Sequence, residues 1–237
     1  MSSLAVIFVL GLLVLVHEAG HLLAAKLTGI PVARFSVGFG RKLAGFEWRG
    51  TEYRLSLIPL GGYVMPGVAT ESEYLAVPLH KRIVFALGGP VANILFVLPM
   101  LAAVNLLRGH VSAYAVFIAP FSQLGGMTLQ MLTALTKLFS EPTGISGVVG
   151  IVANGGEFIA MSAVRAFFFT AILSLNLAVF NLLPLPPLDG GKILLDSIQR
   201  VFPGARKAYL PVVLAGWLMM LGLMIYATTL DIGRIVT

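Results

Sequence analysis

The sequence has no cysteine and few charged residues. Without cysteine among its 237 residues, disulfide bonds, thiolate metal sites and a cysteine nucleophile are excluded. Only 11% of the residues are charged, whereas a soluble domain carries about 25%. With 58% hydrophobic residues, the chain could not hide its apolar surface from water. The composition therefore excludes soluble, disordered and coiled-coil proteins, and it predicts one polytopic membrane domain over residues 1–237.

Four apolar stretches are long enough to cross a bilayer, which requires about 20 residues. They cover residues 3–27, 83–107, 160–183 and 208–230. A fifth stretch, residues 111–136, is interrupted by Pro120 and polar residues, so we expect an outer interfacial segment over residues 111–140. The first stretch follows no basic region and precedes no small-residue cleavage site, so we expect a retained span rather than a signal peptide. The predicted fold class is a polytopic α-helical membrane protein with about four transmembrane helices.

Basic residues are distributed unevenly among the loops that four spans create. Eleven lysines and arginines fall within residues 33–82 and 185–207, and three fall on the opposite side. Because cytoplasmic loops carry an excess of Lys and Arg, we expect these two loops in the cytoplasm and both termini outside. The basic cytoplasmic loops then account for the net charge of +6, so we expect no nucleic-acid partner.

Between the first two spans the hydrophobic pattern changes to a period of two. Apolar and polar residues alternate in residues 32–39, 46–49 and 53–57, which is typical of half-buried strands, and Gly50 indicates a hairpin turn. We expect a small β-sheet over about residues 32–63, lying on the cytoplasmic membrane surface. Its edge could receive an extended peptide, or the hairpin could be purely structural.

The first span contains the motif His17-Glu18-Ala19-Gly20-His21. Residues i and i+4 of a helix lie on one face, so both imidazoles can bind one zinc ion while Glu18 acts as general base on the metal-bound water. Polar groups inside a membrane span are costly and functional by default. The motif therefore predicts a zinc hydrolase, with a buried structural cluster as the alternative.

A catalytic zinc usually has three protein ligands, so a third is expected from the cytoplasmic half of the membrane. Asp189 follows the third span, where prolines stiffen the chain and two glycines allow a sharp turn back toward the motif. Asp189 could instead cap a helix over residues 192–202. We expect that helix to be an amphipathic surface helix carrying Asp196.

Asparagines in the spans are weaker signals. Asn176 and Asn181 lie five residues apart on the third span, just before Asp189. We interpret both as residues that line the site and hold the substrate backbone, with interhelical hydrogen bonding as the alternative. Asn93 follows two glycines and a proline, and we interpret it as a packing residue.

Together these motifs resemble the site-2 proteases, most closely the bacterial regulator-of-sigma-E protease group. The likeness covers nearly the whole chain except about residues 111–140. It is carried by HEAGH at 17–21, FSVGFG at 35–40, GTEY at 50–53, IPLGGY at 58–63, GPVAN at 89–93 and residues 181–191.

The resemblance implies an intramembrane zinc metalloprotease in which His17, His21 and Asp189 match the zinc ligands and Glu18 the catalytic glutamate. Asn176 and Asn181 match asparagines that are associated with substrate handling in that family. The sheet matches one thought to present the substrate as an added strand. The implied substrates are single-span membrane proteins, such as anti-sigma factors or signal-peptide remnants, cut in regulated intramembrane proteolysis after an upstream protease. The implied location is the bacterial cytoplasmic (inner) membrane, with the active site toward the cytoplasm.

One departure from that group concerns its PDZ domains, which lie between the second and third spans. Here the connection, residues 108–157, has 50 residues and does not have the pattern of a PDZ fold. Exclusion of untrimmed substrates by PDZ domains therefore cannot be carried over. Two other functions stay open, namely a membrane metal or proton transporter and an inactive chaperone of membrane helices.

Overall fold

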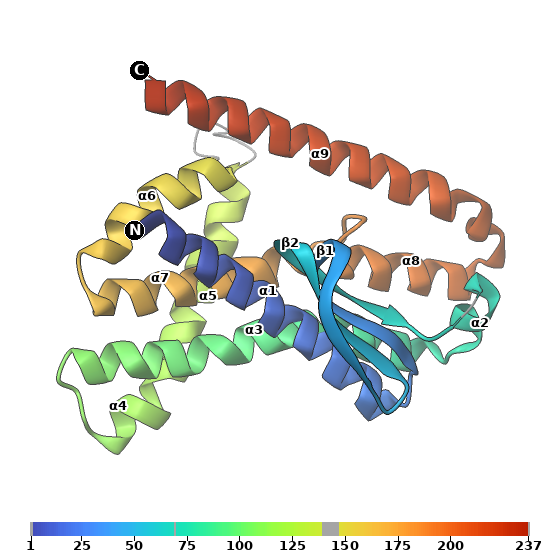
Figure 1. The fold of residues 1–237 in the computed structure, drawn as a ribbon, viewed down its shortest axis with the longest axis horizontal. Helices are drawn as coiled ribbons and strands as arrows, with labels where there is room; N and C mark the ends of the chain where they lie inside the picture. Colours follow the sequence, from blue (N-terminus) through green and yellow to red (C-terminus); the bar gives the residue numbers. More distant parts are fainter. Residues whose placement is uncertain (1, 69, 139–146, 237) are drawn as a thin grey trace. The chain divides into compact units, whose positions relative to one another are not determined.

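The computed structural model describes residues 2–68, 70–138 and 147–236 (Figure 1). Its elements, in chain order, are α1 Ser2–Thr28, β1 Val32–Trp48, β2 Thr51–Pro66, α2 Glu71–Ala76, α3 Leu79–Leu107, α4 Ala113–Phe117, α5 Ala119–Leu138, α6 Val148–Ala160, α7 Ala163–Asn181, α8 Asp189–Val201, a 3₁₀ turn Pro203–Ala205 and α9 Arg206–Val236.

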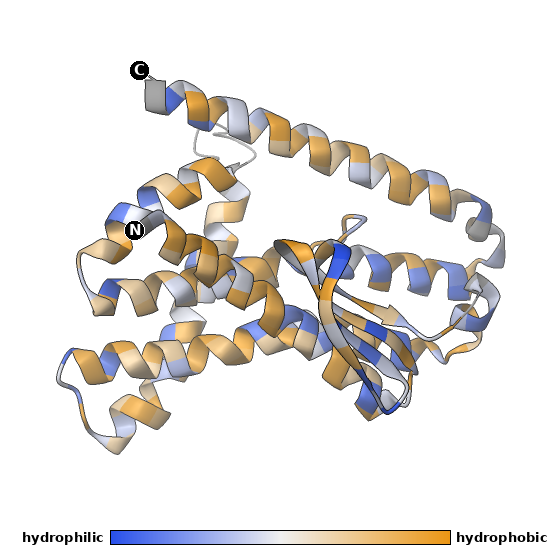
Figure 2. Ribbon diagram, in the orientation of Figure 1, coloured by the Kyte–Doolittle hydropathy of each residue, from blue (hydrophilic) through white to orange (hydrophobic). Residues whose placement is uncertain are grey.

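Four helices of the described chain are long and apolar enough to cross a membrane. They are α1, α3, α7 and α9, with candidate spans Ser3–Thr28, Leu79–Leu107, Ala163–Asn181 and Lys207–Arg234. Figure 2 shows them as the most continuously hydrophobic ribbons. The predicted fold class, four transmembrane helices with a small sheet, is confirmed. The third span begins at Ala163 rather than 160, because Ser162 accepts a hydrogen bond from the Arg165 amide and starts a new helix there.

The predicted outer segment, residues 111–140, contains the short helix α4 and the 20-residue helix α5. Its last two residues, 139 and 140, lie outside the described residues. Helix α5 is not among the candidate spans of the described chain. The interfacial position of this segment stays a prediction.

Backbone proximity divides the chain into two compact units, which we describe separately. The first contains Met1–Leu10, Ile94–Asn176 and Trp217–Thr237, and the second contains Gly11–Asn93 and Leu177–Gly216. The single domain expected from the sequence stays a prediction. All the predicted site residues except Asn176 belong to the second unit.

In the first unit, a buried carboxylate joins α6 to α9. The Asp231 Oδ2 atom accepts a hydrogen bond of 2.7 Å from the Gly150 amide. A Cβ atom built on Gly150 would lie 2.5 Å from Asp231, so only glycine permits this approach. Gly150 therefore allows α6 and α9 to approach closely.

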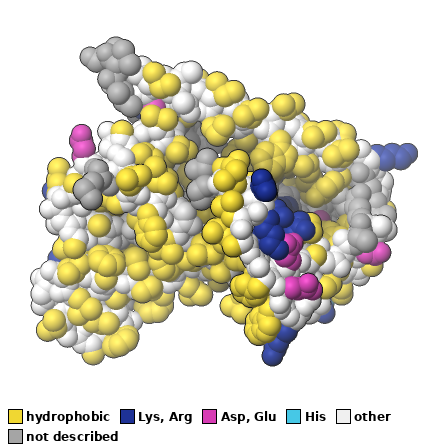
Figure 3. All heavy atoms as spheres, viewed as in Figure 1, with side chains coloured by type: hydrophobic (Ala, Val, Ile, Leu, Met, Phe, Trp, Pro, Cys, Tyr) yellow, Lys and Arg dark blue, Asp and Glu magenta, His cyan; other side chains and the backbone are white. Residues whose placement is uncertain are grey.

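In the second unit, β1 and β2 form an antiparallel ribbon whose turn is Arg49–Gly50, both residues having positive φ angles. The ribbon bends back on itself, so Arg34–Val37 pairs with Glu52–Leu55 and also with Gly62–Met65. The predicted sheet is confirmed and reaches Pro66. Figure 3 shows charged side chains gathered over it, whereas hydrophobic ones cover the helices.

The sheet is joined to the end of α1 by Lys26. Its ammonium group donates a hydrogen bond of 2.6 Å to the Tyr53 hydroxyl and lies 5.1 Å from the centre of the Trp48 ring. Beneath this contact, Ala25, Ile30, Val32 and Phe85 form a buried apolar cluster. The sheet, α1 and the beginning of α3 therefore share one core, which fixes the sheet next to the HEAGH motif.

Candidate metal centre

The HEAGH motif lies where α1 packs most tightly against α3. A Cβ atom on Gly20 would lie 2.2 Å from the Gly88 carbonyl oxygen, so the two backbones touch and neither position tolerates a side chain. One helical turn apart on the face toward α3, His17 and His21 are 7% and 6% exposed. Their Nε2 atoms are 3.2 Å apart. The glycine contact therefore buries both imidazoles side by side.

Asp189 reaches the histidines because the chain folds back sharply after α7. A Cβ atom on Gly190 would lie 2.2 Å from the Leu182 carbonyl oxygen, and one on Gly191 would lie 2.5 Å from Leu185. The start of α8 thus lies directly on the Leu-Pro loop. Asp189 is the first residue of α8, and the preceding N-cap, Leu188, makes no side-chain cap bond. The alternative that Asp189 serves as a helix cap is therefore wrong.

The Asp189 carboxylate lies against both imidazoles. Its Oδ2 atom is 3.1 Å from His17 Nε2 and 3.2 Å from His21 Nε2, and its Oδ1 atom is 3.0 Å from the Lys192 ammonium. Burial by itself would raise the pKa of this carboxyl, but hydrogen bonds from the two histidines when their Nε2 atoms are protonated, together with the Lys192 charge, hold that pKa well below its usual range. Asp189 is therefore a buried, ionised carboxylate that could bind a metal ion through an oxygen atom.

The chemistry of these three side chains fits a metal cation. His21 Nδ1 donates a hydrogen bond of 2.8 Å to the Phe85 carbonyl, so Nε2 of a neutral His21 carries a lone pair. That lone pair faces a carboxylate oxygen 3.2 Å away, an arrangement that a cation between the two atoms stabilises. A Cβ atom on Gly89 would lie 2.5–2.6 Å from both imidazoles, so glycine leaves the ligand atoms uncovered.

A third contact to the histidines was missed by sequence reasoning. Asn93 is fully buried, and its side-chain amide lies 3.3 Å from His17 Nδ1. Because rotation of the amide exchanges its nitrogen and oxygen, Asn93 can accept a hydrogen bond from Nδ1 and leave Nε2 for a metal. The packing role assigned from the sequence was therefore incomplete. The available signal was the spacing of Asn93 from Gly88 and Gly89, which places it one helical turn further along α3.

Glu18 points toward the sheet rather than toward α3. A Cβ atom on Gly62 would lie 2.9 Å from Glu18 Cγ, so the half-buried glutamate packs directly against the β2 backbone. Gly62 also pairs with Val37 of β1. In this position Glu18 directly follows His17 in the sequence and lies next to β2 of the sheet.

The two other predicted site residues, Asn176 and Asn181, are both on α7. Asn181 donates a hydrogen bond of 2.9 Å to the Leu177 carbonyl of its own helix. Asn176 is the last residue of its segment in the first unit. Their roles in substrate handling stay predictions.

The expectation of a surface helix carrying Asp196 is corrected. Helix α8 begins at Asp189, and Asp196 is only 4% exposed because it pairs at 3.0 Å with the buried Arg82 of α3. The Tyr74 ring covers the Arg82 guanidinium at 5.5 Å. Sequence periodicity places Asp196 on the polar face of α8, but α2 and α3 cover that face.

Comparison with known proteins gives the family. The model of Peptidase family M50 matches residues 5–225. A protein of Campylobacter jejuni, whose name describes a zinc metalloprotease, is 26% identical over 346 aligned residues, which cover 98% of this chain and 94% of the relative. That alignment is longer than this chain, so the relative contains inserted residues with no counterpart here.

Two other relatives agree. A protein of Vibrio cholerae, also named as a zinc metalloprotease, is 31% identical over 206 residues, covering 77% of this chain and 44% of the relative. The membrane metalloprotease ARASP of Arabidopsis thaliana chloroplasts is 26% identical over 341 residues, covering 94% and 76%. The buried His17, His21 and Asp189 form the group of the described residues that could hold the ion. The chain therefore belongs to Peptidase family M50, the site-2 protease family, and is a membrane metalloprotease with zinc as its cofactor.

Proposed function

We propose that this protein hydrolyses peptide bonds within or near the transmembrane segments of single-span membrane proteins, in regulated intramembrane proteolysis. In this proposal His17, His21 and Asp189 hold the zinc ion and Glu18 is the catalytic base. The observation that carries the proposal is the burial of two histidines on a candidate membrane span, within 3.2 Å of a carboxylate from a distant part of the chain.

Zinc held by these three side chains supplies a Lewis acid that polarises the scissile carbonyl and acidifies water. Glu18 takes the proton from the attacking water and delivers it to the leaving amine, so that the peptide bond breaks without a charged amide leaving group. The Lys192 ammonium, 3.0 Å from Asp189 Oδ1, favours the ionised form of Asp189. The Phe85 carbonyl and Asn93 hold the imidazole rings in orientation.

The sheet supports a way to present the substrate. Peptide bonds in a helix are shielded by their own hydrogen bonds, so a transmembrane substrate must unwind before attack. Within the described chain, the register gives Gly62–Met65 one partner segment, Arg34–Val37. In this proposal the opposite edge of Gly62–Met65 pairs with an unwound substrate, and the contact between Gly62 and Glu18 supports a substrate position near the base. In this proposal Asn176 and Asn181 hold the substrate backbone farther along its path.

The distribution of Lys and Arg supports an active site that opens to the cytoplasm, with both termini outside. By resemblance, we place the protein in the bacterial cytoplasmic (inner) membrane. The proposed substrates are anti-sigma factors or signal-peptide remnants that an upstream protease has already trimmed.

The test is cleavage of single-span reporters with shortened outer domains by the purified protein and by Glu18→Gln. We expect the variant to keep its zinc but to lose about 10²–10⁴-fold in rate, the usual contribution of a general base. Glu47→Gln, which changes an exposed glutamate of β1, is the matched control and should cleave like the wild type. Equal cleavage by the wild type and Glu18→Gln would contradict the assignment of the base.

A second set of reporters tests substrate unwinding. Glycine or proline near the cut site should speed cleavage, and a run of alanine and leucine should slow it, because the latter raises the cost of unwinding. Rates that do not depend on helix stability would remove the strand-addition step while leaving the zinc chemistry intact.

A further inference from the structure

A cavity lies at the opposite end of α8 from Asp189. Its volume is about 360 Å³, and it is bounded by the end of α2, the first turn of α3 and the last turn of α8. Most of its lining residues are apolar, and three polar side chains also line it, from Arg82, Gln199 and Arg200. In Figure 1, α2 lies beside this end of α8. A cavity of this size is in the range of small-molecule sites.

Three buried polar atoms of the side chains that line this cavity lack a hydrogen-bond partner within the described chain. Gln199 is 6% exposed, yet within the described chain neither its Nε2 nor its Oε1 atom has a hydrogen-bond partner. Arg82 Nη1 lies 3.0 Å from Asp196 Oδ1, but this contact has no hydrogen-bond geometry. An unsatisfied buried polar group costs free energy, so a ligand that pairs with all three atoms gains more than the same contacts would at the surface.

The unpaired atoms define the chemistry of that ligand. Arg82 and Gln199 each offer a donor, and Gln199 also offers an acceptor. The Arg82 charge is balanced by Asp196, whereas Arg200 makes no ion pair among the described side chains. The cavity therefore suits a group with one negative charge, several acceptor oxygens and one hydrogen-bond donor.

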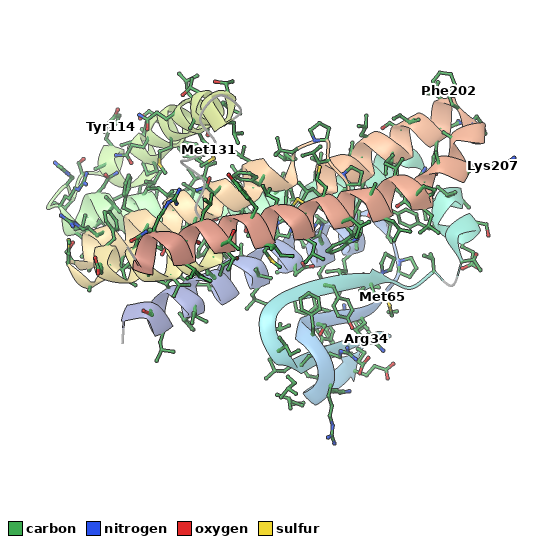
Figure 4. The ribbon with its side chains drawn as sticks, turned by 90° about the horizontal axis from the view of Figure 1, so that it is seen from above. Arg34, Met65, Tyr114, Met131, Phe202 and Lys207 are labelled. Atoms are coloured by element: carbon green, nitrogen blue, oxygen red, sulfur yellow. The ribbon has the colours of Figure 1, made fainter. Side chains whose placement is uncertain are left out.

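The cavity lies at the level where two spans begin. Arg82 is in the first turn of the span Leu79–Leu107, and Pro203, which also lines the cavity, comes four residues before the span Lys207–Arg234. Val201 and Phe202, which directly precede Pro203, are apolar residues that are 68% and 65% exposed. Figure 4 shows the labelled Phe202 and Lys207 projecting away from the helices at this end. Lipid headgroups occupy this level of a bilayer, and basic pockets between spans bind them.

We propose that this cavity binds the headgroup of an anionic glycerophospholipid, with the phosphodiester accepting from Arg82, Arg200 and Gln199 Nε2. A headgroup hydroxyl, as in phosphatidylglycerol, donates to Gln199 Oε1. The acyl chains pass over Val201 and Phe202 into the bilayer. Phosphatidylcholine has no donor for Oε1 and no net charge, so it fits poorly.

The experiment is a calorimetric titration of the full-length, detergent-purified protein with dihexanoyl-phosphatidylglycerol below its micelle concentration. We expect saturable binding that is about tenfold weaker in Gln199→Leu, because the leucine cannot bond to a charged headgroup. Lys207→Gln, which removes a nearby charge outside the cavity, should bind like the wild type. Dihexanoyl-phosphatidylcholine should also bind about tenfold more weakly than phosphatidylglycerol.

Folding of the variant is checked separately. Replacing an unpartnered buried amide by leucine should leave the lipid-free stability unchanged or raised, and zinc content should stay the same. Absence of phosphatidylglycerol binding, equal binding by Gln199→Leu, equal binding of phosphatidylcholine, or equally tight binding of inorganic phosphate would each overturn the proposal. The last result would indicate a free-phosphate site instead.

Discussion

Helix α8 buries two aspartates, one at its first residue and one two turns later, and the two have different partners. Asp189, at the first residue, faces two imidazole nitrogens at 3.1–3.2 Å. Asp196, two turns later, faces the buried guanidinium of Arg82 at 3.0 Å. One oxygen of the first carboxylate faces two nitrogens that can each donate an electron pair to a metal ion, while its other oxygen contacts Lys192; the second carboxylate lies beside the permanent cation of Arg82. A buried carboxylate among lone pairs indicates a metal site, whereas one beside arginine indicates a structural ion pair.

Removal of each carboxylate in turn should give the largest difference. We expect Asp189→Ala to lose zinc and activity, by more than the roughly 10- to 100-fold that loss of an outer hydrogen-bond partner costs. Asp196→Ala should unfold more easily but keep one zinc per folded molecule. Zinc content, activity and denaturation are measured on both purified variants. Full zinc retention in Asp189→Ala would remove this residue from the site.

Breaking the ion pair from its other side should lower stability and leave the zinc content unchanged. We expect Arg82→Met to destabilise the protein by about 3–5 kcal/mol near neutral pH, because Asp196 is left buried and unpaired. The double variant Arg82→Met/Asp196→Leu should recover most of that loss. Denaturation in detergent measures all three proteins, and no recovery in the double variant would contradict a purely ionic role.

The destabilisation by Arg82→Met should depend on pH in a defined direction. Burial raises the pKa of Asp196 even against the opposing charge of Arg82. In the variant the neutral acid is favoured more strongly in the folded state than in the unfolded chain. The loss should therefore be full at high pH and shrink as pH falls and the carboxyl takes up a proton.

A smaller effect is expected from the residue that orients His17. Asn93→Ala should weaken zinc binding about 10- to 100-fold, the usual cost of losing an outer partner of a metal ligand. Asn105→Ala is the matched control, because Asn105 is equally buried on α3 but bonds to the Ala115 carbonyl. Competition with a chelator measures both variants. Equal zinc affinities would show that Asn93 only packs.

The smallest effect concerns Glu52, an ion-paired carboxylate near the surface of the sheet. Hydrogen bonds from Lys42 and Arg34 lower its pKa from 4.5 to about 2. Since the folded pKa is lowered, its contribution to stability is present above about pH 4.5 and is lost as pH falls through about 2. Trp48 fluorescence in a Trp217→Phe background should change with a midpoint near pH 2, and Glu52→Gln should remove that transition. A midpoint near 4.5 would mean that the ion pairs do not persist in solution.

Much of the fold was predictable because each part has a local signal. Long apolar runs predict α1, α3, α7 and α9, and the period of two predicts the sheet. The HEAGH spacing places two imidazoles on one helical face whatever the rest of the chain does. Asp189 was harder, because the same Asp-Gly-Gly sequence is compatible with a helix cap, and only the approach of α8 to α1 distinguishes the two.

Asn93, Asp196 and Gln199 could not be assigned from sequence. Asn93 and Asp196 each have a partner on another helix far along the chain, and Gln199 faces a cavity that three helices form. Periodicity shows which face such a residue occupies but does not show whether another element covers that face. Glu18 is similar, since its contact with Gly62 depends on how the ribbon β1–β2 bends back on itself.

The sequence by itself determined the membrane class, the helix and strand pattern, and the presence of a metal-binding pair on the first span, because hydropathy and helical spacing are properties of neighbouring residues. The tertiary structure decided which carboxylate meets that pair, which asparagine orients it, and which end of α8 carries a cavity. The metal site depends on glycine contacts at Gly20, Gly88 and Gly190, where two backbones approach closely enough to join residues that lie up to 172 positions apart.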